Sequence, residues 1–207
     1  ITDVGSAKRD TITKINRIKR KDINWISSHP IAGSEVSGPL NGNENLFVNK
    51  WSVIIKQKNS QNKEMKRILK FWKLLGSKTV SMDADQHDKI FAITSHLPHL
   101  IAYNLILTAT NFKISNKDNV LRFSAGGLRD FSRIAASNEI MWRDIFFNNK
   151  SNMLKVIDLF IKNLKIFKQD IKLNRKNLET KLKNLKKVRQ KIVLLKQDTS
   201  KPDFGRI

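Results

Sequence analysis

The chain has 207 residues, 40% of them hydrophobic, a formal net charge of +22 at pH 7 and no cysteine. This size and hydrophobic content are typical of one or two globular domains, and the lack of cysteine excludes disulfides and thiolate metal sites. The sequence shows neither a run of about 18 apolar residues nor a secretory signal, so we expect a cytoplasmic protein that does not cross a membrane.

The positive charge favours an anionic partner, and nucleic acid is the first candidate to weigh. Lysine is abundant along the whole chain, however, and is not gathered in one patch. No aromatic residues alternate with basic ones as a stacking surface for bases requires. We therefore expect attraction of small anionic ligands and no specific binding of nucleic acid.

Strand and helix patterns alternate over the first 82 residues. Strands are expected at 1–4, 23–30, 46–57 and 78–82, and helices at 7–20 and 62–77, the second ending near Gly76. The buried stripe expected on the second helix is Met65, Ile68, Leu69, Phe71, Trp72 and Leu75. This order predicts an α/β layer with a parallel or mixed sheet.

Helical periodicity replaces the strand pattern after Met82, so residues 83–207 predict an all-α domain. The apolar stretch 85–112 predicts a buried helix or a pair of helices broken around Pro98. Gly126 and Gly127 are typical of a hinge between helical pieces. Two apolar stripes, at 154–171 and 178–195, predict two long helices that need partners, either from this chain or from a second copy.

All four histidines lie between residues 29 and 99. His87 and His96 are nine residues apart and face opposite ways on an ideal helix, at ~100° per residue. Only His96 and His99 share a face, and Pro98 distorts that turn. We therefore expect no metal site, and we expect His87 and His96 to form hydrogen bonds within the helical core.

His29 ends a predicted strand and precedes Pro30, at a place where α/β folds present ligand-facing groups. Neutral imidazole accepts a proton near neutral pH, so His29 is either a general base or an ordinary strand-end histidine. Arg129 and Arg133 are four residues apart, so they either bind a carboxylate together or form surface ion pairs with neighbouring aspartates.

Seven segments resemble, in order, the prephenate/arogenate (cyclohexadienyl) dehydrogenase family. They are DVGSAK, SHPIAGSEVSG, LF…W, FWKLLGS, HDKIFAITSHLPHLIAY, AGGLRDFSRIAAS and MWRDIFFNN. Their order and approximate spacing hold over nearly the whole chain, and the tail QDTSKPDFGR is similar to the end of the broad-specificity cyclohexadienyl dehydrogenases.

The resemblance implies an NAD- or NADP-dependent oxidoreductase of tyrosine biosynthesis. Such an enzyme removes a hydride from ring carbon C4 of prephenate or arogenate, releases carbon dioxide and leaves an aromatic ring. The implied fold is a partial Rossmann-like α/β layer at 1–82, the C-terminal part of a cofactor domain, followed at 83–207 by an all-α helical domain that binds substrate and forms a homodimer.

The resemblance also assigns site residues. His29 corresponds to the histidine that deprotonates the ring hydroxyl during hydride transfer, and Ser6, with Gly5, to positions beside the nicotinamide. Arg133 corresponds to the arginine that binds a substrate carboxylate, and His99 to a histidine near the side-chain carboxylate. Supporting pocket positions are Ser34, Glu35, His87, Gly126, Asp130 and Trp142.

The family's G-x-G-x-x-G fingerprint, which holds the cofactor pyrophosphate, is missing from the sequence, since none of the 8 glycines has that spacing. We therefore expect a fragment that lacks the first half of its cofactor domain and is a poor enzyme alone. The alternative is a non-catalytic helical dimer module left by truncation. The sequence decides neither between prephenate and arogenate nor between NAD and NADP.

Overall fold

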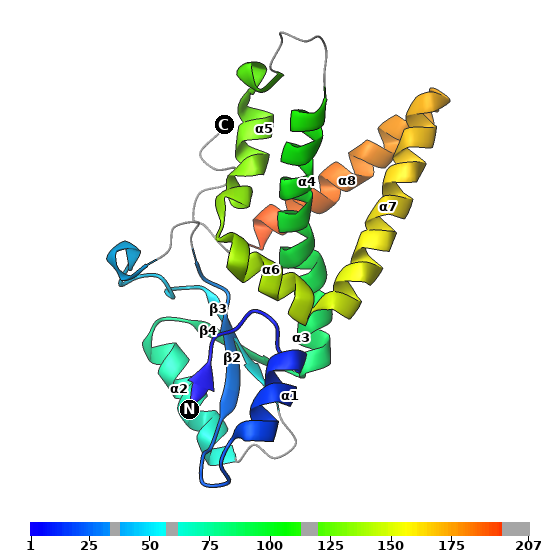
Figure 1. The fold of residues 1–207 in the computed structure, drawn as a ribbon. Helices are drawn as coiled ribbons and strands as arrows, with labels where there is room; N and C mark the ends of the chain where they lie inside the picture. The colour runs from blue at the N-terminus through cyan, green and yellow to red at the C-terminus, as the bar shows by residue number, and fades with distance from the viewer. Residues whose placement is uncertain (34–37, 57–61, 113–119, 196–207) are drawn as a thin grey trace.

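The computed structural model describes residues 1–33, 38–56, 62–112 and 120–195, and it has a sheet layer below a helical layer (Figure 1). The strands are β1 (Thr2–Asp3), β2 (Ile26–Pro30), β3 (Trp51–Ile55) and β4 (Lys78–Met82), side by side in that order. β2 is parallel to β1 and antiparallel to β3, and β4 is parallel to β3. The predicted mixed sheet is therefore confirmed.

Helices cover both faces of this sheet. Helix α2 (Asn62–Leu74) packs through Trp72 against Ile26 and Ile54 on one face. On the other face, Val53 and Ile55 pack against Ile12 of α1 (Arg9–Ile18) and Phe91 of α3 (Ala84–Phe91). Side chains of β3 alternate between the faces, and both sets are buried because both faces are covered.

The apolar stripe of α2 that packs on the sheet is narrower than the sequence predicted. Met65, Ile68, Leu69 and Trp72 pack on the sheet, whereas Phe71 and Leu75 are exposed. Phe71 follows the helical spacing only approximately, and it lies outside the contact face. Its ring instead meets the edge of the Trp72 ring, with the ring centroids 5.2 Å apart.

The helical layer begins with one continuous run. Helix α3 passes through a π-helical turn, η2 (Ala92–His96), directly into α4 (Leu97–Asn111). Of the two alternatives predicted for this stretch, the structure has the continuous run and no break at Pro98. Pro98 lies in the first turn of α4, directly after the π-helical turn. The change in helix type falls just before it, at η2.

The run 84–111 is less buried than its composition predicted. Within α4 only Leu97 and Ala102 are buried, and Ile106 and Leu107 are exposed. The run is also long and apolar enough to cross a membrane, which corrects the expectation that no such segment exists. One such helix is weak evidence for a membrane span, because core helices of soluble proteins share these properties.

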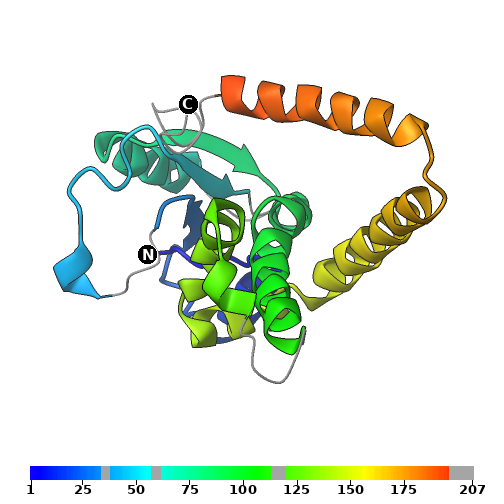
Figure 2. The ribbon, with the colours of Figure 1, turned by 90° about the horizontal axis from the view of Figure 1, so that it is seen from above.

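The remaining helices cover α4 on one side and then extend away from it. They are the single turn η3 (Val120–Phe123), α5 (Gly126–Ser132), η4 (Arg133–Ala136), α6 (Glu139–Asn148), α7 (Lys150–Lys172) and α8 (Asn177–Leu194). A short turn, η1 (Pro39–Asn41), lies between β2 and β3. Figure 2 shows that α7 and α8 form an arm that leaves the body of the chain.

The α7–α8 arm is held at its joint by a buried carboxylate. Asp170 is 1% exposed and forms ion pairs with Arg175 and Lys181. Asn174 takes the left-handed conformation between the helices, with φ 47°. The two predicted long helices and their polar joint are confirmed, while most of their apolar stripe is exposed in the single chain.

Gly76 ends α2 in a conformation that only glycine adopts easily. Its φ is +81°, and an added Cβ would lie 3.0 Å from Cγ2 and 3.2 Å from Cα of Val48. We predict that Gly76→Ala lowers the free energy of unfolding by about 2 kcal/mol, from backbone strain and this contact. The measurement is urea unfolding at fixed protein concentration.

The matched control is Gly127→Ala. Gly127 lies in α5, and an added Cβ would meet nothing within 4 Å. Alanine there should keep or slightly raise stability, through its higher helix propensity. Equal losses in the two variants would show that Gly76 has no special backbone role.

Candidate active site

His29 lies on β2 directly before Pro30, the last residue of the strand, and it is 8% exposed. The ring of Phe91 meets it edge-on, with centroids 4.8 Å apart. Since β1 and β2 are parallel, their C-terminal ends lie at one edge of the sheet. The Gly5–Ser6 turn after β1 and His29 on β2 therefore share that edge.

A chain of hydrogen bonds supports His29 from behind. His29 Nδ1 lies 2.7 Å from His87 Nε2, and His87 Nδ1 lies 2.8 Å from Asp88 Oδ1. His87 is 0% exposed and Asp88 is 1% exposed. The resemblance assigns His87 a supporting position in the pocket, and in the structure His87 lies in the interior between His29 and the carboxylate of Asp88.

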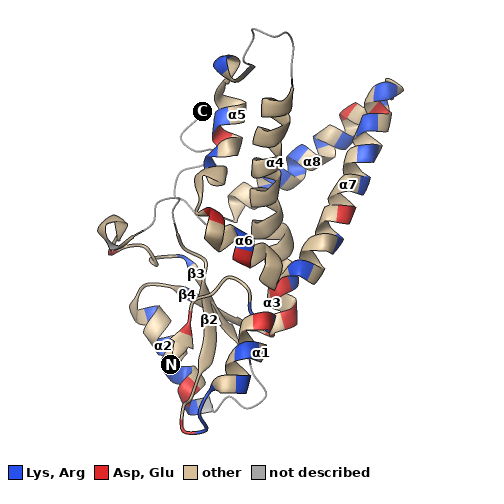
Figure 3. Cartoon of the chain, viewed as in Figure 1, with Lys and Arg blue, Asp and Glu red and all other residues tan. Residues whose placement is uncertain are grey.

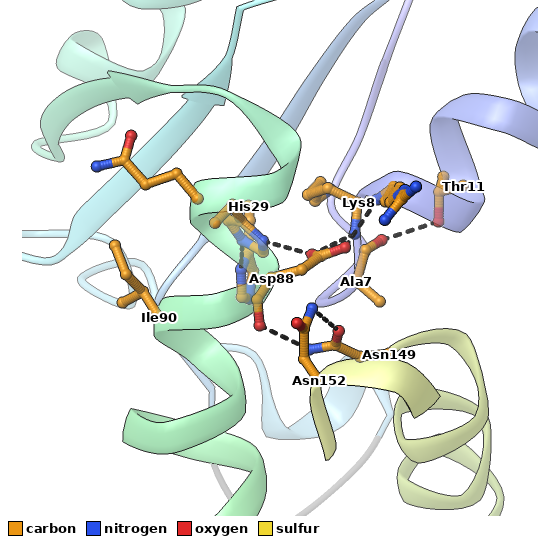
Figure 4. A network of polar contacts seen from close by, with 12 residues as sticks. Ala7, Lys8, Thr11, His29, Asp88, Ile90, Asn149 and Asn152 are labelled. Carbon is orange, nitrogen blue, oxygen red and sulfur yellow. Dashed lines mark hydrogen bonds and ion pairs between the residues drawn. The ribbon is translucent and has the colours of Figure 1, made fainter. Parts of the chain in front are cut away.

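Asp88 also holds the start of helix α1 (Figure 4). Its Oδ1 accepts a hydrogen bond from the backbone N–H of Lys8, and its Oδ2 accepts one from that of Arg9, both at 2.9 Å. These N–H groups have no partner within their own helix, and a negative charge is favourable at a helix N-terminus. The carboxylate on α3 thus caps a helix of the sheet layer.

Lys8 is a buried cation at the same place. Its Nζ donates to Asp3 Oδ2 at 2.7 Å and to the backbone carbonyl of Ser28, so it links the ends of β1 and β2. The backbone N–H of Gly5 also donates to Asp3 Oδ2, at 3.1 Å. The turn that carries Ser6 is therefore tied down on both sides. Ser6 itself is half-buried.

Burial makes these histidines weak bases. It lowers the pKa of His29 well below its usual 6.5, and the neighbouring His87 and Lys8 lower it further. Burial also lowers the pKa of His87, although Asp88 opposes this. Burial raises the pKa of Asp88, but the hydrogen bonds from His87, Arg9 and Lys8 lower it overall. Near neutral pH, two neutral histidines therefore face an ionised aspartate.

A second cluster lies on α4 and α6. The rings of His99 and Trp142 are stacked, with centroids 3.6 Å apart and 21° between their planes. His99 Nδ1 donates to the carbonyl of Ser95 at 3.0 Å. Nearby, His96 Nδ1 lies 3.2 Å from Asn149 Nδ2, which also donates to the backbone carbonyl of Asp88 at 2.8 Å. Asn149 therefore joins the two clusters.

A π-helical turn lies between His87 and His96. Ideal α-helical spacing places the two histidines on opposite faces; both are fully buried, and Asn149 links their surroundings. A π-helical turn has more residues per turn than an α-helix, so it shifts the faces that follow it. The prediction that His87 and His96 form hydrogen bonds in the core is confirmed.

The segment that carries Arg129 and Arg133 lies beside α4. Arg133 begins η4 and is exposed, as is Asp130 on α5, while Gly126 begins α5. Tyr103 of α4 donates a hydrogen bond to the carbonyl of Ser137, which fixes the end of this segment against the helix. The predicted pocket positions Ser34 and Glu35 lie outside the described residues.

Three residues that organise this region, Lys8, Asp88 and Asn149, were not among the residues predicted from the sequence. Each is polar and buried, which apolar periodicity does not reveal. The signals present were the HD pair at 87–88 and the lysine two residues after Ser6. Among the described residues, no group of three histidines or carboxylates is arranged to hold a metal ion.

Comparisons with known proteins agree over nearly the whole chain. The family model for the prephenate dehydrogenase dimerization domain matches residues 83–191, and that for its nucleotide-binding domain matches residues 1–81. The chain is 35% identical to the cyclohexadienyl dehydrogenase of Zymomonas mobilis over 165 residues, covering 80% of this chain and 56% of that protein. It is 32% identical to the prephenate dehydrogenase of Bacillus subtilis over 164 residues, covering 79% and 44%.

Solved structures give the same relationship. The prephenate dehydrogenase of Aquifex aeolicus, in complex with hydroxyphenyl propionate and NAD+, superimposes with a TM-score of 0.86 and 34% identity. That match covers 92% of this chain and 66% of the solved one. The chain spans about half the length of the curated relatives that it matches.

The buried histidines predict a loss of stability in acid. Burial lowers the pKa of His96 to about 4, so below 6.5 the unfolded chain binds protons that the folded chain does not. The free energy of unfolding should therefore fall as the pH drops from 6.5 toward 4, with His96 alone contributing about 3 kcal/mol. Urea unfolding at several pH values measures this slope.

The slope should be shallower in a His96→Gln variant, which has no imidazole to titrate at this position. A stability profile that stays flat over this pH range in the unaltered chain would contradict the assignment of neutral, buried histidines.

Proposed function

Because the chain belongs to the prephenate dehydrogenase family, we propose that it carries the substrate half of an oxidative decarboxylation of prephenate or arogenate. The observation that carries this proposal is the neutral, nearly buried His29, held at the same sheet edge as the Gly5–Ser6 turn. This observation supports a base and a hydroxyl at the position where the ring and the nicotinamide are expected to meet.

His29 is the proposed base. It takes the proton of the ring hydroxyl while the hydrogen on C4 departs as a hydride, so no protonated ketone forms. The bond to the ring carboxylate then breaks, carbon dioxide leaves, and its electron pair completes the aromatic ring. Ser6 is proposed to lie beside the same hydroxyl. The protein chiefly supplies orientation and one proton acceptor.

Arg133 is proposed to bind a substrate carboxylate, because a guanidinium forms two parallel hydrogen bonds with it. His99, stacked on Trp142, is proposed to lie near the side-chain carboxylate. His99 lies on α4, and Arg133 begins the segment that Tyr103 anchors to that helix. Supporting roles are proposed for Ser34, Glu35, His87, Gly126 and Asp130.

The Gly5–Ser6 turn fits the nicotinamide end of a cofactor. A Cβ at Gly5 would lie 3.3 Å from Asp3 Oδ2, so glycine fits the close packing of this turn against Asp3. A bound nicotinamide supplies the hydride acceptor. NAD+ is the first cofactor to test, because the A. aeolicus relative was solved with it, and NADP+ is the alternative. We place the activity in the cytoplasm.

We further propose a homodimer formed through the helical layer. Leu182, Leu185, Val188 and Ile192 form an exposed apolar stripe on α8, and the dimerization-domain match covers this stretch as far as residue 191. Basic residues lie along α7 and α8, whereas α4 carries no Lys, Arg, Asp or Glu (Figure 3). Exposed apolar surface of this extent is typical of an interface.

Sedimentation equilibrium should therefore give the mass of a dimer. Leu185→Glu should shift the chain toward monomer, because it introduces a charge into the stripe. Gln190→Glu adds the same charge to the same helix outside the stripe and should remain dimeric. A monomer at high concentration of the unaltered chain would contradict the proposed homodimer.

The activity is tested by NADH formation from prephenate. The assay uses the chain itself and a form that also carries a complete glycine-rich nucleotide-binding half. We predict that His29→Asn lowers turnover by about 10²- to 10⁴-fold, the usual contribution of a general base, while circular dichroism stays unchanged.

Unchanged turnover in His29→Asn would remove His29 from the role of base. If neither form oxidises prephenate or arogenate although both are folded, the non-catalytic dimer module becomes the better description.

A further inference from the structure

The Asp88 carboxylate lies where three segments of the proposed site meet. The carboxylate bonds to His87 on its own helix and to the first N–H groups of α1, and the backbone carbonyl of Asp88 accepts a hydrogen bond from Asn149 (Figure 4). We propose that Asp88 is a positioning residue, which acts through His87 to hold His29 in the tautomer whose Nε2 is free to accept a proton. This inference rests on the proposed function of His29.

The first step is the tautomer of His87. An ionised carboxylate has no hydrogen to donate, so at 2.8 Å from Asp88 Oδ1 the Nδ1 of His87 carries the proton. A neutral imidazole has only one N–H group. The Nε2 of His87 therefore has a lone pair, directed at His29.

The second step transfers this constraint to His29. Its Nδ1 lies 2.7 Å from His87 Nε2, which is a hydrogen-bond distance and too short for two facing lone pairs. His29 Nδ1 must then donate, so its proton is on Nδ1 and its Nε2 has the lone pair. A general base needs that lone pair, because a protonated Nε2 cannot take the hydroxyl proton.

The surroundings keep both rings neutral. His87, Lys8 on the segment before α1, and His96 on the π-helical turn oppose a charge on His29. Lys8 also opposes a charge on His87, where Asp88 of α3 and Asp3 of β1 act in the opposite direction. Burial lowers the pKa of both His29 and His87. The relay of one N–H per ring therefore holds at the pH where the base works.

The same carboxylate orders the other proposed catalytic group. Asp88 fixes the backbone N–H groups of Lys8 and Arg9, which follow Ser6 by two and three residues. One side chain thus sets both the orientation of the base and the position of the Gly5–Ser6 turn. A residue that served only to cap α1 would fix the turn and leave the tautomer of His29 free.

Nitrogen-15 NMR of the histidine rings in the unaltered chain tests this directly, because protonated and unprotonated ring nitrogens have well-separated shifts. We expect His29 and His87 each to show a protonated Nδ1 and an unprotonated Nε2, with His29→Asn assigning the first signal. A protonated Nε2 on His29, or a mixture of tautomers, overturns the inference.

Two variants then separate positioning from capping. His87→Phe keeps the Asp88 contacts with Lys8 and Arg9 and removes only the relay, so His29 should become a mixture of tautomers. Asp88→Ala should do the same. The control is Asp170→Ala, which removes an equally buried carboxylate at the α7–α8 joint and should leave the His29 signals unchanged. An unaltered His29 pattern in His87→Phe overturns the proposal.

Steady-state kinetics give a second readout, in the form that also carries a complete glycine-rich nucleotide-binding half. His87→Phe should lower kcat by about 10²-fold with KM changed little, as expected for a misoriented base. If prephenate is not oxidised but the tautomer is as stated, the proposed function fails and the positioning geometry stands. If turnover is normal and His29 carries its proton on Nε2, the function stands and the inference fails.

Discussion

The hydrogen bonds of the Asp88 carboxylate join the two layers of this chain. Asp88 lies on α3, yet its partners are the first N–H groups of α1 and, through His87, the last residues of β2. A buried carboxylate needs such partners, because an ion left without them in the interior costs several kcal/mol. The helical layer is therefore fixed to the sheet by the same contacts that support His29.

Burying these polar side chains costs desolvation free energy. Their role is better explained by the single arrangement of the chain that they select than by a gain in stability. Lys8, Asp88 and three histidines are buried where apolar side chains of similar volume would pack without desolvation. Each of them has a hydrogen-bond partner from another segment of the chain. His87 bonds in addition to its neighbour Asp88. Such bonds allow one arrangement of β1, β2, α1 and α3, which apolar contacts alone do not enforce.

Much of the fold could be predicted from the sequence, because strands and amphipathic helices show apolar residues at fixed spacing. The four strands, α2 and the α7–α8 pair were found in this way, and His29 was found from its place at a strand end. Spacing does not reveal a π-helical turn, so the turn at Ala92–His96 was not predicted. Nor does it reveal which apolar face has a partner, so α4 was expected to be buried when Ile106 and Leu107 are exposed.

Asn149 connects the proposed site to the arm that leaves it. It is the last residue before α7, and its amide bonds both to the carbonyl of Asp88 and to His96. Its Oδ1 in turn accepts a hydrogen bond from Asn152, in the first turn of α7. The same amide group therefore contacts the backbone of Asp88 and the first turn of α7. A second copy packed on α7 and α8 would bear on that joint, so assembly and the geometry of the base share one structural element.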